Sequence, residues 1–264
     1  MLTNFLPNRS NSGQFRAQKL GEYRNNVALA VLALPRVGRT FSSPARIFLL
    51  FLIVSGAGSF AFGRTPIKPS PDISAEERRE AEQLLWALGY WAGPVDSKFD
   101  LASRHALIAF QKVEARPRTG ILTRAELDAL RHATRPRARF EGYPHIEIDL
   151  KRQILFVIDE SGSISRILSV STGSEKRYVD HGEVHRAHTP RGTFKVQRKI
   201  KGWRLSSLGL MYYPSYIFNG VAVHGSLFVP AYPDSHGCIR VPMYAAKELS
   251  SFMPVGIEVI VYDS

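Results

Sequence analysis

The spacing of apolar residues changes once along this chain of 264 residues, and that change limits what the chain can fold into. Before about residue 132, apolar side chains recur every three or four positions, which is the period of a helix that buries one face. The first such set is Ala81, Leu84, Leu85 and Leu88. After about residue 145 they alternate, as strand residues do, in Ile146, Ile148 and Leu150. We therefore expect an α+β protein in which a helical module precedes a β-rich one.

The helical module is expected over residues 74–132, as three short helices in a small bundle. The first and third helices begin with the capping boxes SAEE and TRAE, residues 74–77 and 123–126. In such a box the cap hydroxyl and the acid three residues later each accept a backbone N–H bond. The second helix is expected over residues 101–113.

The β-rich module is expected over residues 143–264, mainly antiparallel and with one main helix. The run ILFVI at residues 154–158, which leads into the turn at residues 159–162, is typical of a strand. Proline at position 242 suits the first turn of the helix, which is expected over residues 242–252. About 120 residues are enough for such a module to fold by itself. A linker rich in arginine and proline, residues 131–144, separates it from the helices.

Most of the net charge lies at the amino end. The formal net charge is +12, and residues 1–64 hold eight of the 35 Lys and Arg residues but only one of the 23 Asp and Glu residues. This basic excess stands next to an apolar stretch at residues 47–62. The placement favours a membrane or export function over nucleic-acid binding.

The apolar stretch, residues 47–62, is short for a bilayer span, which needs about 20 residues. It has the proportions of a signal-peptide core, and Ser59-Phe60-Ala61 fits the small-x-small cleavage pattern. An uncleaved membrane anchor and a buried core element are the alternatives. We expect residues 1–64 to be disordered around this segment. The rest of the chain is then expected outside the cytoplasm, in the periplasm or cell wall.

Cys238 is the only cysteine, so it has no disulfide partner within the chain. A lone cysteine is commonly a small buried hydrophobe, but this one follows His236 and Gly237 and comes after the His-Gly pair that starts at His224. A thiol attacks only as the thiolate, and free cysteine has a pKa of about 8.5. The histidines, and a helix starting near Pro242, should favour the thiolate. We therefore interpret Cys238 as a nucleophile.

The neighbouring residues suit that chemistry. His224 ends an alternating apolar strand, which would hold its imidazole on a rigid element as a general base. Gly225 leaves the backbone free to bend and offers its carbonyl to orient the ring. Gly237 would let a substrate oxygen approach backbone N–H groups, as an oxyanion hole requires.

Three strings stand out in the helical module: EQLLWALGYWAGPVDSKFD, ALIAFQK and TGILTRAELDAL. Together they resemble the peptidoglycan-binding domain type one over residues 74–132, and the resemblance implies binding to wall glycan. Ser97 stands where that family usually has a glycine. Trp86, Tyr90 and Trp91 could stack on sugars, or could fill the core as aromatic residues at helical spacing commonly do.

The β-rich module carries five further motifs in order: VSTG at 170–173, TPRGTF at 189–194, HG at 224–225, SHGCIRV at 235–241 and GIEVIV at 256–261. This set resembles the L,D-transpeptidases with a YkuD-type catalytic domain. The resemblance implies that Cys238 is the nucleophile and that His224 is the base that activates it. It also implies that the Gly225 carbonyl orients His224, and that the N–H groups of His236, Gly237 and Cys238 hold the oxyanion. His236 could relay protons or be purely structural.

Three more residues are expected to bind substrate: Arg240, Ser235 and Tyr213. Arg240 would secure the loop or meet a carboxylate of the substrate. Tyr213 belongs to an aromatic segment, residues 202–220, that could line the donor groove or pack in the core. Other histidines have zinc-like spacing but no carboxylate or cysteine pattern to complete a site, so neither metal nor cofactor is expected: His181, His185 and His188.

The resemblance implies a reaction on peptidoglycan stem peptides. The thiolate would attack the carbonyl between the L-centre of a diamino acid and a terminal D-Ala, release D-Ala and form a thioester. An amine of a second stem would then resolve the thioester into a cross-link. Two alternatives stay open. Water could be the acceptor, which would make an L,D-carboxypeptidase or endopeptidase, or the protein could bind the wall without catalysis.

Overall fold

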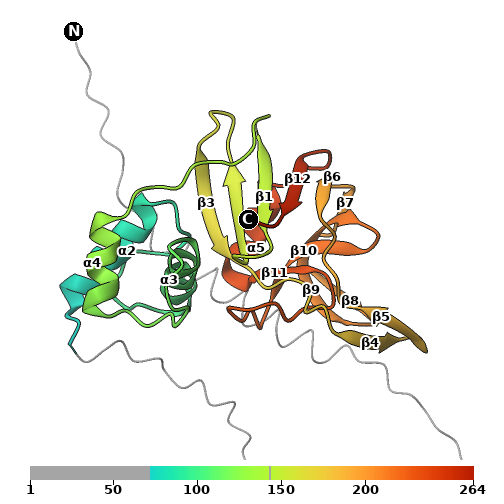
Figure 1. Ribbon diagram of the computed structural model, residues 1–264, viewed down its shortest axis with the longest axis horizontal. Helices are drawn as coiled ribbons and strands as arrows, with labels where there is room; N and C mark the ends of the chain where they lie inside the picture. The colour runs from blue at the N-terminus through green and yellow to red at the C-terminus, as the bar shows by residue number, and fades with distance from the viewer. Residues whose placement is uncertain (1–71, 143) are drawn as a thin grey trace, which may run out of the picture. The chain divides into compact units, whose positions relative to one another are not determined.

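The computed structural model describes residues 72–142 and 144–264 (Figure 1). The predicted export or anchor segment at 47–62, and the predicted disorder of residues 1–64, lie outside the described residues. Among the helices of the described part, none combines the length and the apolar character that a bilayer crossing requires.

The helical region contains α2 (Ala75–Ala87), α3 (Leu101–Val113) and α4 (Arg124–His132). The capping box of α2 is complete, because the Ser74 N–H donates to the Glu77 carboxylate and the Glu77 N–H donates to the Ser74 hydroxyl. The box predicted for α4 is only half formed. Thr123 Oγ1 accepts the Glu126 N–H, but the Glu126 carboxylate pairs with the Arg116 guanidinium at 3.1 Å instead of turning back to the cap.

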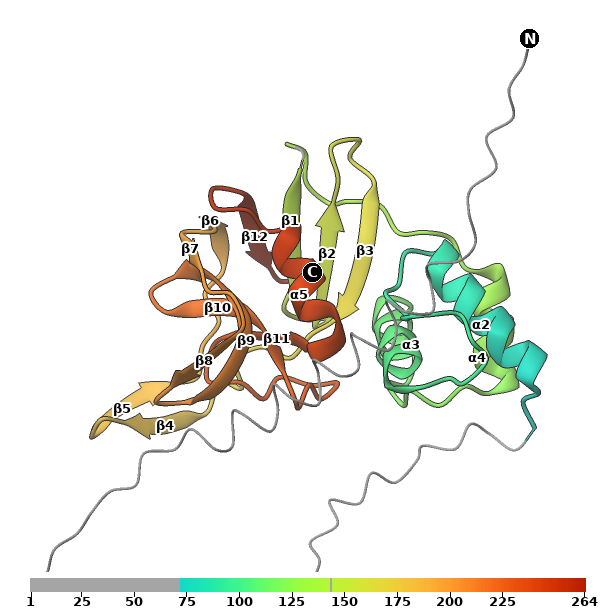
Figure 2. The same ribbon diagram turned by 180° about the vertical axis from the view of Figure 1, so that it is seen from behind.

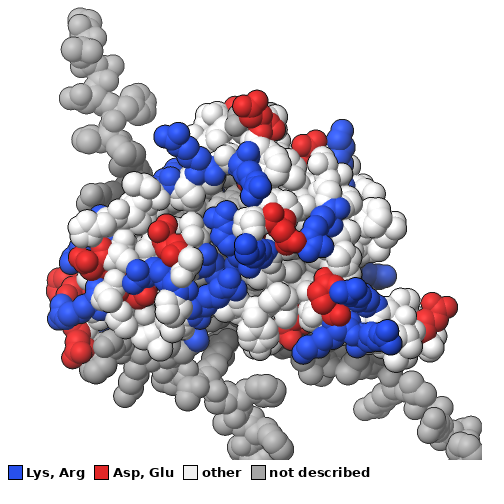
Figure 3. All heavy atoms as spheres, viewed as in Figure 1, with Lys and Arg blue, Asp and Glu red and all other residues white. Residues whose placement is uncertain are grey.

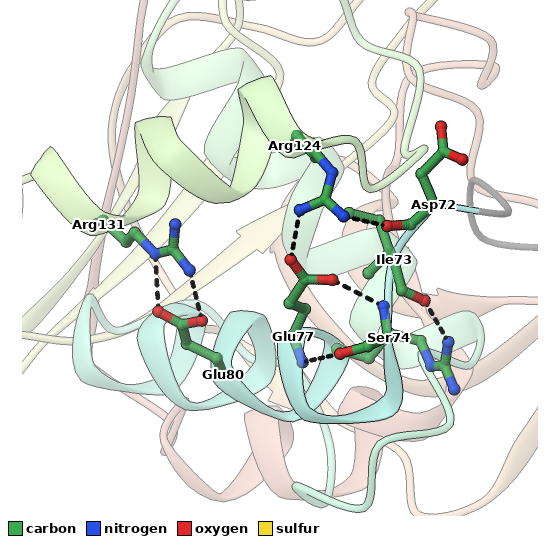
Figure 4. Close-up of polar contacts among 8 residues, drawn as sticks. Asp72, Ile73, Ser74, Glu77, Glu80, Arg124 and Arg131 are labelled. Carbon is green, nitrogen blue, oxygen red and sulfur yellow. Dashed lines mark hydrogen bonds and ion pairs between the residues drawn. The ribbon is translucent and has the colours of Figure 1, made fainter.

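Ion pairs join α2 to α4 on the surface (Figure 4). The Arg131 guanidinium donates to both carboxylate oxygens of Glu80, each at 2.8 Å. Arg124 donates to the Glu77 carboxylate and to the backbone carbonyl of Asp72. Exposed pairs of this kind contribute little stability, because water and salt screen them. The apolar core beneath them therefore holds these helices together.

A buried carboxylate organises the turn between α2 and α3. Glu82 is fully buried and accepts the backbone N–H groups of Asp96, Ser97 and Phe99, and also the hydroxyl of Ser103. Ser97 and Phe99 have φ angles of +67° and +41°, a conformation that residues other than glycine rarely adopt. The hydrogen bonds to Glu82 compensate for that cost, which explains how a serine replaces the glycine usual at position 97.

The β-rich region is built from two sheets. The first has the order β3-β2-β1-β12-β6, antiparallel except for the β1–β12 pair. Its strands are β1 (His145–Asp149), β2 (Ile154–Ile158), β3 (Ile164–Ser169), β6 (Gly192–Lys195) and β12 (Glu258–Tyr262).

The second sheet has the order β11-β10-β9-β7, with β8 paired to β9, and here only β10 and β11 are parallel. Its strands are β7 (Arg198–Lys199), β8 (Trp203–Ser206), β9 (Gly209–Phe218), β10 (Val221–Ser226) and β11 (Ile239–Pro242). A separate hairpin is formed by β4 (Arg177–Asp180) and β5 (Glu183–Arg186), and the predicted helix is α5 (Met243–Ser251). The predicted α+β class is thus confirmed.

Strands β2 and β3 of the first sheet are buried on both faces, and each face belongs to a different core. One face packs toward α5 and the second sheet through residues such as Ile146, Leu155 and Val259. The other packs against the helices, and its contributors are Ile154, Phe156, Ile158, Ile164 and Ile167. In both ribbon views α3 lies beside β3 (Figures 1 and 2). The β-rich region, which we expected to fold by itself, therefore shares a core with the helices.

Two segments outside the helices and strands add contacts between the helical region and the first sheet. The Ile167 N–H donates to the Gly89 carbonyl, and the Trp91 N–H donates to the Ile167 carbonyl, so the chain after α2 covers the open edge of β3. The predicted linker also packs on the sheet. Glu147 Oε1 accepts the N–H groups of Arg139 and Phe140 at 2.8 and 2.9 Å.

Candidate active site

Two parallel strands bring Cys238 and His224 to the same face of the second sheet. His224 on β10 lies opposite Arg240 on β11. Cys238 is two residues before Arg240, so the same register places it beside Ala222. Because side chains alternate between faces, positions two apart share a face, and the side chains of Cys238 and His224 point the same way. Both line one cavity of about 810 Å³.

The cavity wall comes mainly from β8, β9 and the loops beside the sheet. Besides Cys238 and His224, it includes His188, Trp203, Arg204, Met211, Tyr216 and Tyr178. Aromatic and apolar side chains line the cavity together with cationic and polar ones. Ligand pockets commonly combine an apolar lining with a small number of polar groups.

His224 is held as a neutral base. Its Nδ1 lies 3.0 Å from the Gly225 carbonyl oxygen, which can only accept, so the ring proton is assigned to Nδ1 and Nε2 keeps its lone pair. Burial lowers the pKa of His224 to about 4; the Gly225 carbonyl opposes this shift, and the positive charge of Arg240 adds to it. The imidazole is therefore uncharged at neutral pH.

Cys238 is half-buried, and its Sγ lies 3.9 Å from the carbonyl oxygen of Gly220. Burial raises the pKa of the thiol, while the backbone of Ala222 and the charge of Arg240 favour the thiolate more weakly. The prediction that the surroundings favour the thiolate at rest is therefore wrong. The strand β11 stands between Cys238 and α5 in the chain, so that helix does not begin directly after the cysteine.

The loop of residues 234–238, called the cysteine loop below, is held by its own serine. Ser235 is buried; its hydroxyl donates to the Cys238 carbonyl at 2.6 Å and accepts the Gly237 N–H at 3.0 Å. The Gly237 N–H, which we expected at the oxyanion, is thus used inside the loop. Gly237 has φ +131°, and a Cβ there would lie 2.8 Å from the His188 carbonyl oxygen. Close packing therefore requires glycine at this position.

The motifs that carry the family resemblance brace this loop. The Thr172 carbonyl accepts the Ser235 N–H at 2.9 Å. The Gly173 N–H donates to Thr189 Oγ1 at 2.8 Å, and that hydroxyl donates to the Gly237 carbonyl at 2.7 Å. Residues of VSTG and TPRGTF, far from Cys238 in sequence, thus set where its loop lies.

Gly225 is needed for close packing, and not for the backbone freedom that the sequence led us to predict. It lies within β10 without a positive φ angle, so freedom to bend is not what it supplies. A Cβ there would stand 2.6 Å from the Ala246 Cβ and 3.2 Å from the Met243 Sδ. Glycine lets α5 pack closely on the strand that carries His224.

The three residues expected to bind substrate occupy different settings. Arg240 lines the cavity and pairs with Asp234 at 3.3 Å, which ties β11 to the cysteine loop. The Ser235 hydroxyl forms its hydrogen bonds within the cysteine loop, to the Cys238 carbonyl and the Gly237 N–H. Tyr213 is not among the described residues that line the cavity; its ring packs edge-on against Tyr212 at 4.7 Å.

The histidine-rich loop is the β4–β5 hairpin. His181 and Gly182 both have positive φ angles and form its two-residue turn. His188 pairs with Glu175 at 2.8 Å. Among the described residues, no three His, Cys, Asp or Glu side chains are grouped to hold a metal ion.

Tyr178, a residue of this hairpin, is a cavity residue that the sequence did not predict. It lines the cavity, and its ring lies 4.7 Å from that of His236. The short hairpin has no alternating apolar pattern, and its His-Gly turn at 181–182 is not one of the dipeptides that mark a two-residue hairpin, so no local pattern predicts it.

The three aromatic residues considered for sugar stacking differ in how deeply they are buried. Tyr90 and Trp91 are 1% and 5% exposed, so they belong to the core. Trp86 is partly buried, and the Arg166 guanidinium lies over its ring at 5.1 Å. For Tyr90 and Trp91, the core interpretation is confirmed.

Family models match both regions of the chain. Residues 143–261 match the L,D-transpeptidase catalytic domain (YkuD), and residues 74–130 match a putative peptidoglycan binding domain. The crystal structure of the L,D-transpeptidase from Xylanimonas cellulosilytica is 36% identical, with 75% of this chain and 99% of that one covered at a TM-score of 0.69. The chain belongs to the L,D-transpeptidase family.

Two other L,D-transpeptidase structures are more distant. The one from Stackebrandtia nassauensis is 21% identical over 75% of this chain and 98% of that one, with a TM-score of 0.43. The catalytic domain from E. faecium is 25% identical over 47% of this chain and 100% of that one, with a TM-score of 0.36. No curated protein matches the sequence.

Proposed function

We propose that this L,D-transpeptidase is exported and cross-links peptidoglycan stem peptides through a thioester on Cys238. One observation carries the proposal: a neutral imidazole, with its Nδ1 proton used by the Gly225 carbonyl, shares a strand face and a cavity with the lone thiol. A base and a nucleophile so placed are what covalent acyl transfer needs.

In the acylation step, His224 Nε2 takes the proton of the thiol as Sγ attacks the carbonyl before the terminal D-Ala. The C–S bond forms, the C–N bond breaks, and the imidazolium returns the proton to the departing D-Ala amine. The raised pKa of Cys238 and the lowered pKa of His224 both disfavour a resting ion pair. Proton transfer is therefore coupled to attack on the substrate.

In the second step, an amine of another stem attacks the thioester. His224 accepts its proton, the C–S bond breaks, and the proton ends on the sulfur. The oxyanion of each step is assigned to the N–H groups of His236 and Cys238, since the Gly237 N–H donates to Ser235. Arg240, which lines the cavity, is assigned to a stem carboxylate.

The helical module, residues 74–132, is assigned to glycan binding, and the module of residues 143–264 to catalysis. The apolar segment 47–62 is assigned to export, either as a signal peptide or as an anchor. Both assignments place the reaction at the cell wall, where stem peptides are found.

Product analysis tests the proposal. Residues 65–264 are incubated with tetrapeptide muropeptides, and the products are separated by mass. Cross-linked dimers and free D-Ala are expected, and both should be absent with Cys238→Ala. Shortened monomers alone would make the protein a carboxypeptidase. No product from the unaltered protein would overturn the enzymatic assignment.

A further inference from the structure

Lys112 is a buried lysine that the mechanism above does not use. Figure 3 shows Lys and Arg side chains spread over the surface of one face, whereas Lys112, in the last turn of α3, is 1% exposed. Its Nζ donates to Ser169 Oγ at 2.8 Å and to the carbonyls of Gln153 and Val170, each at 3.0 Å. An ammonium has three N–H donors, and all three are used on the β-rich region.

This arrangement has an energetic cost. Lysine is almost never fully buried unless its charge is paired, and none of its three acceptors is a carboxylate. Burial, with the nearby charge of Arg118, lowers the pKa of Lys112 well below its usual value. An apolar side chain of the same length would fill this space without that cost. What lysine adds is directed hydrogen bonding to the strand ends.

The hydrogen bonds continue from Lys112 to the cysteine loop. Gln153, whose carbonyl accepts from Lys112, uses its side chain to bind Thr172: Nε2 donates to Thr172 Oγ1 at 2.7 Å and Oε1 accepts the Thr172 N–H at 2.8 Å. The Thr172 carbonyl then accepts the N–H groups of Asp234 and Ser235 at 3.0 and 2.9 Å. Ser235 in turn holds the Cys238 carbonyl.

Gln153 itself needs support. It is buried and has φ +62°, a left-handed conformation that is unfavourable for glutamine. Lys112 binds its carbonyl, and the Gln153 N–H donates to the Asp149 carbonyl at 2.8 Å. The Gln153 carbonyl also accepts the Val170 N–H at 3.0 Å, so without Lys112 it would keep one of its two partners at the point where the side chain turns toward Thr172.

A second contact links the helical region to the neighbourhood of the loop independently. Arg118, in the segment between α3 and α4, donates to the carbonyls of Ala231 and Lys151. Ala231 precedes the cysteine loop by three residues. The helical region thus reaches the surroundings of Cys238 along two routes.

We propose that Lys112 is a positioning residue for the cysteine loop, residues 234–238, so that the helical region forms part of the catalytic unit. It touches neither substrate nor the reacting atoms and acts through Gln153 and Thr172. The proposal rests on the proposed function of Cys238 as the nucleophile.

The test compares Lys112→Met with Lys98→Met, a matched change on a side chain that is 75% exposed. A carbapenem serves as probe, because the thiol opens its lactam C–N bond, forms a thioester and leaves its proton on the ring nitrogen. We expect Lys112→Met to acylate about tenfold more slowly or worse, since small losses of geometry cost rate. Its melting temperature should fall only modestly, because relief of the buried charge offsets part of the cost of leaving three acceptors without this donor. Lys98→Met should match the unaltered protein in both.

Amide hydrogen exchange supplies a readout that needs no chemistry. The amides of Asp234 and Ser235 should exchange about tenfold faster in Lys112→Met, while those between β1 and β12 keep their rates. Ser169→Ala removes one acceptor only, and provides a milder variant if Lys112→Met does not fold. A double change with Gln153→Leu should add little to the loss from Lys112→Met, because both act on one route.

Equal acylation and equal exchange in Lys112→Met, Ser169→Ala and Lys98→Met would overturn the proposal. A loss of acylation that only follows a loss of folded protein would also overturn it. If the unaltered protein takes up no carbapenem, the function proposed for Cys238 fails instead, and the exchange rates at Asp234 and Ser235 still decide whether Lys112 holds the loop.

Discussion

The β10–β11 pair and the segment around the β4–β5 hairpin both carry histidines, in different surroundings. His224 on β10 is 6% exposed, and its Nδ1 meets a backbone carbonyl. His185 on β5 is far more exposed, and His188, just after β5, pairs with the carboxylate of Glu175. Burial and the carbonyl contact leave His224 neutral, with a lone pair on Nε2 in the cavity that also holds the thiol. His185 and His188 are each 42% exposed and lie near carboxylates, so they lack this buried setting on a strand of the second sheet.

The largest effect is expected from Cys238→Ala. The protein has no other thiol, so the variant should show no carbapenem adduct by intact mass and no cross-linked product. The variant should remain folded, because the thiol is only half-buried and makes one weak hydrogen bond. An adduct that persists on the variant would place the nucleophile elsewhere.

His224→Gln should slow acylation by about 10² to 10⁴-fold, the usual contribution of general base catalysis. The matched control is His236→Gln, because His236 also lines the cavity but packs on Tyr178. We expect a change of less than about tenfold there, as the backbone N–H of residue 236 is retained. Equal losses in the two variants would remove the distinction between these histidines.

Ser235→Ala should slow acylation by about tenfold to a hundredfold. It leaves the Gly237 N–H and the Cys238 carbonyl without their hydroxyl partner, at a cost of about 1–3 kcal/mol for such buried groups. Stopped-flow quenching of fluorescence on acylation measures the rate, and a thermal melt measures the stability. An unchanged rate would mean that Ser235 does not set the geometry of the loop.

The pH dependence of acylation separates a neutral pair from an ion pair. The pKa of His224 is about 4, so the rate should fall about tenfold per pH unit only below that value. It should be nearly flat from pH 5.5 to 8, because the ring stays neutral and the raised pKa of Cys238 keeps the thiol protonated. A rate that rises steeply with an apparent pKa of about 6.5 would contradict this.

Stability must be followed in the same pH series. The pKa of His224 is lower in the folded state than the value of about 6.5 expected in the unfolded chain. The unfolded state therefore binds more protons between these values, and the free energy of unfolding falls as the pH decreases through that window. Circular dichroism at each pH separates this loss from a loss of rate.

His188→Gln should have the smallest effect. It removes a half-exposed pair with Glu175 and leaves the backbone carbonyl beside Gly237 in place. We expect acylation within about twofold of the unaltered protein and a stability change within about 0.5 kcal/mol. A tenfold loss would mean that the His188 side chain takes part in catalysis.

Local patterns predicted most of the strands and helices, including the ILFVI strand and the helix after Pro242. They did not predict the short β4–β5 hairpin, which has no alternating apolar face, or that ILFVI is buried on both sides. The second point depends on residues some forty positions earlier in the chain, in α3, which no local period reveals.

Some features of the candidate site could likewise be predicted from local sequence, and others could not. The positions of Cys238 and His224 follow from strand and motif, because each lies on or beside a regular strand. The use of the Gly237 N–H by Ser235, and the contact between Lys112 and Gln153, depend on atoms placed by tertiary packing. The pKa of the thiol belongs to this second group, since burial is its main cause.

The most direct test of the neutral pair is a ¹⁵N NMR titration of the His224 ring in the resting protein, with Cys238→Ala as reference. We predict a neutral imidazole, protonated on Nδ1, from pH 8 down to about pH 4. A ring that is doubly protonated at pH 7 in the unaltered protein and becomes neutral in Cys238→Ala would reveal a resting thiolate–imidazolium pair and contradict the account.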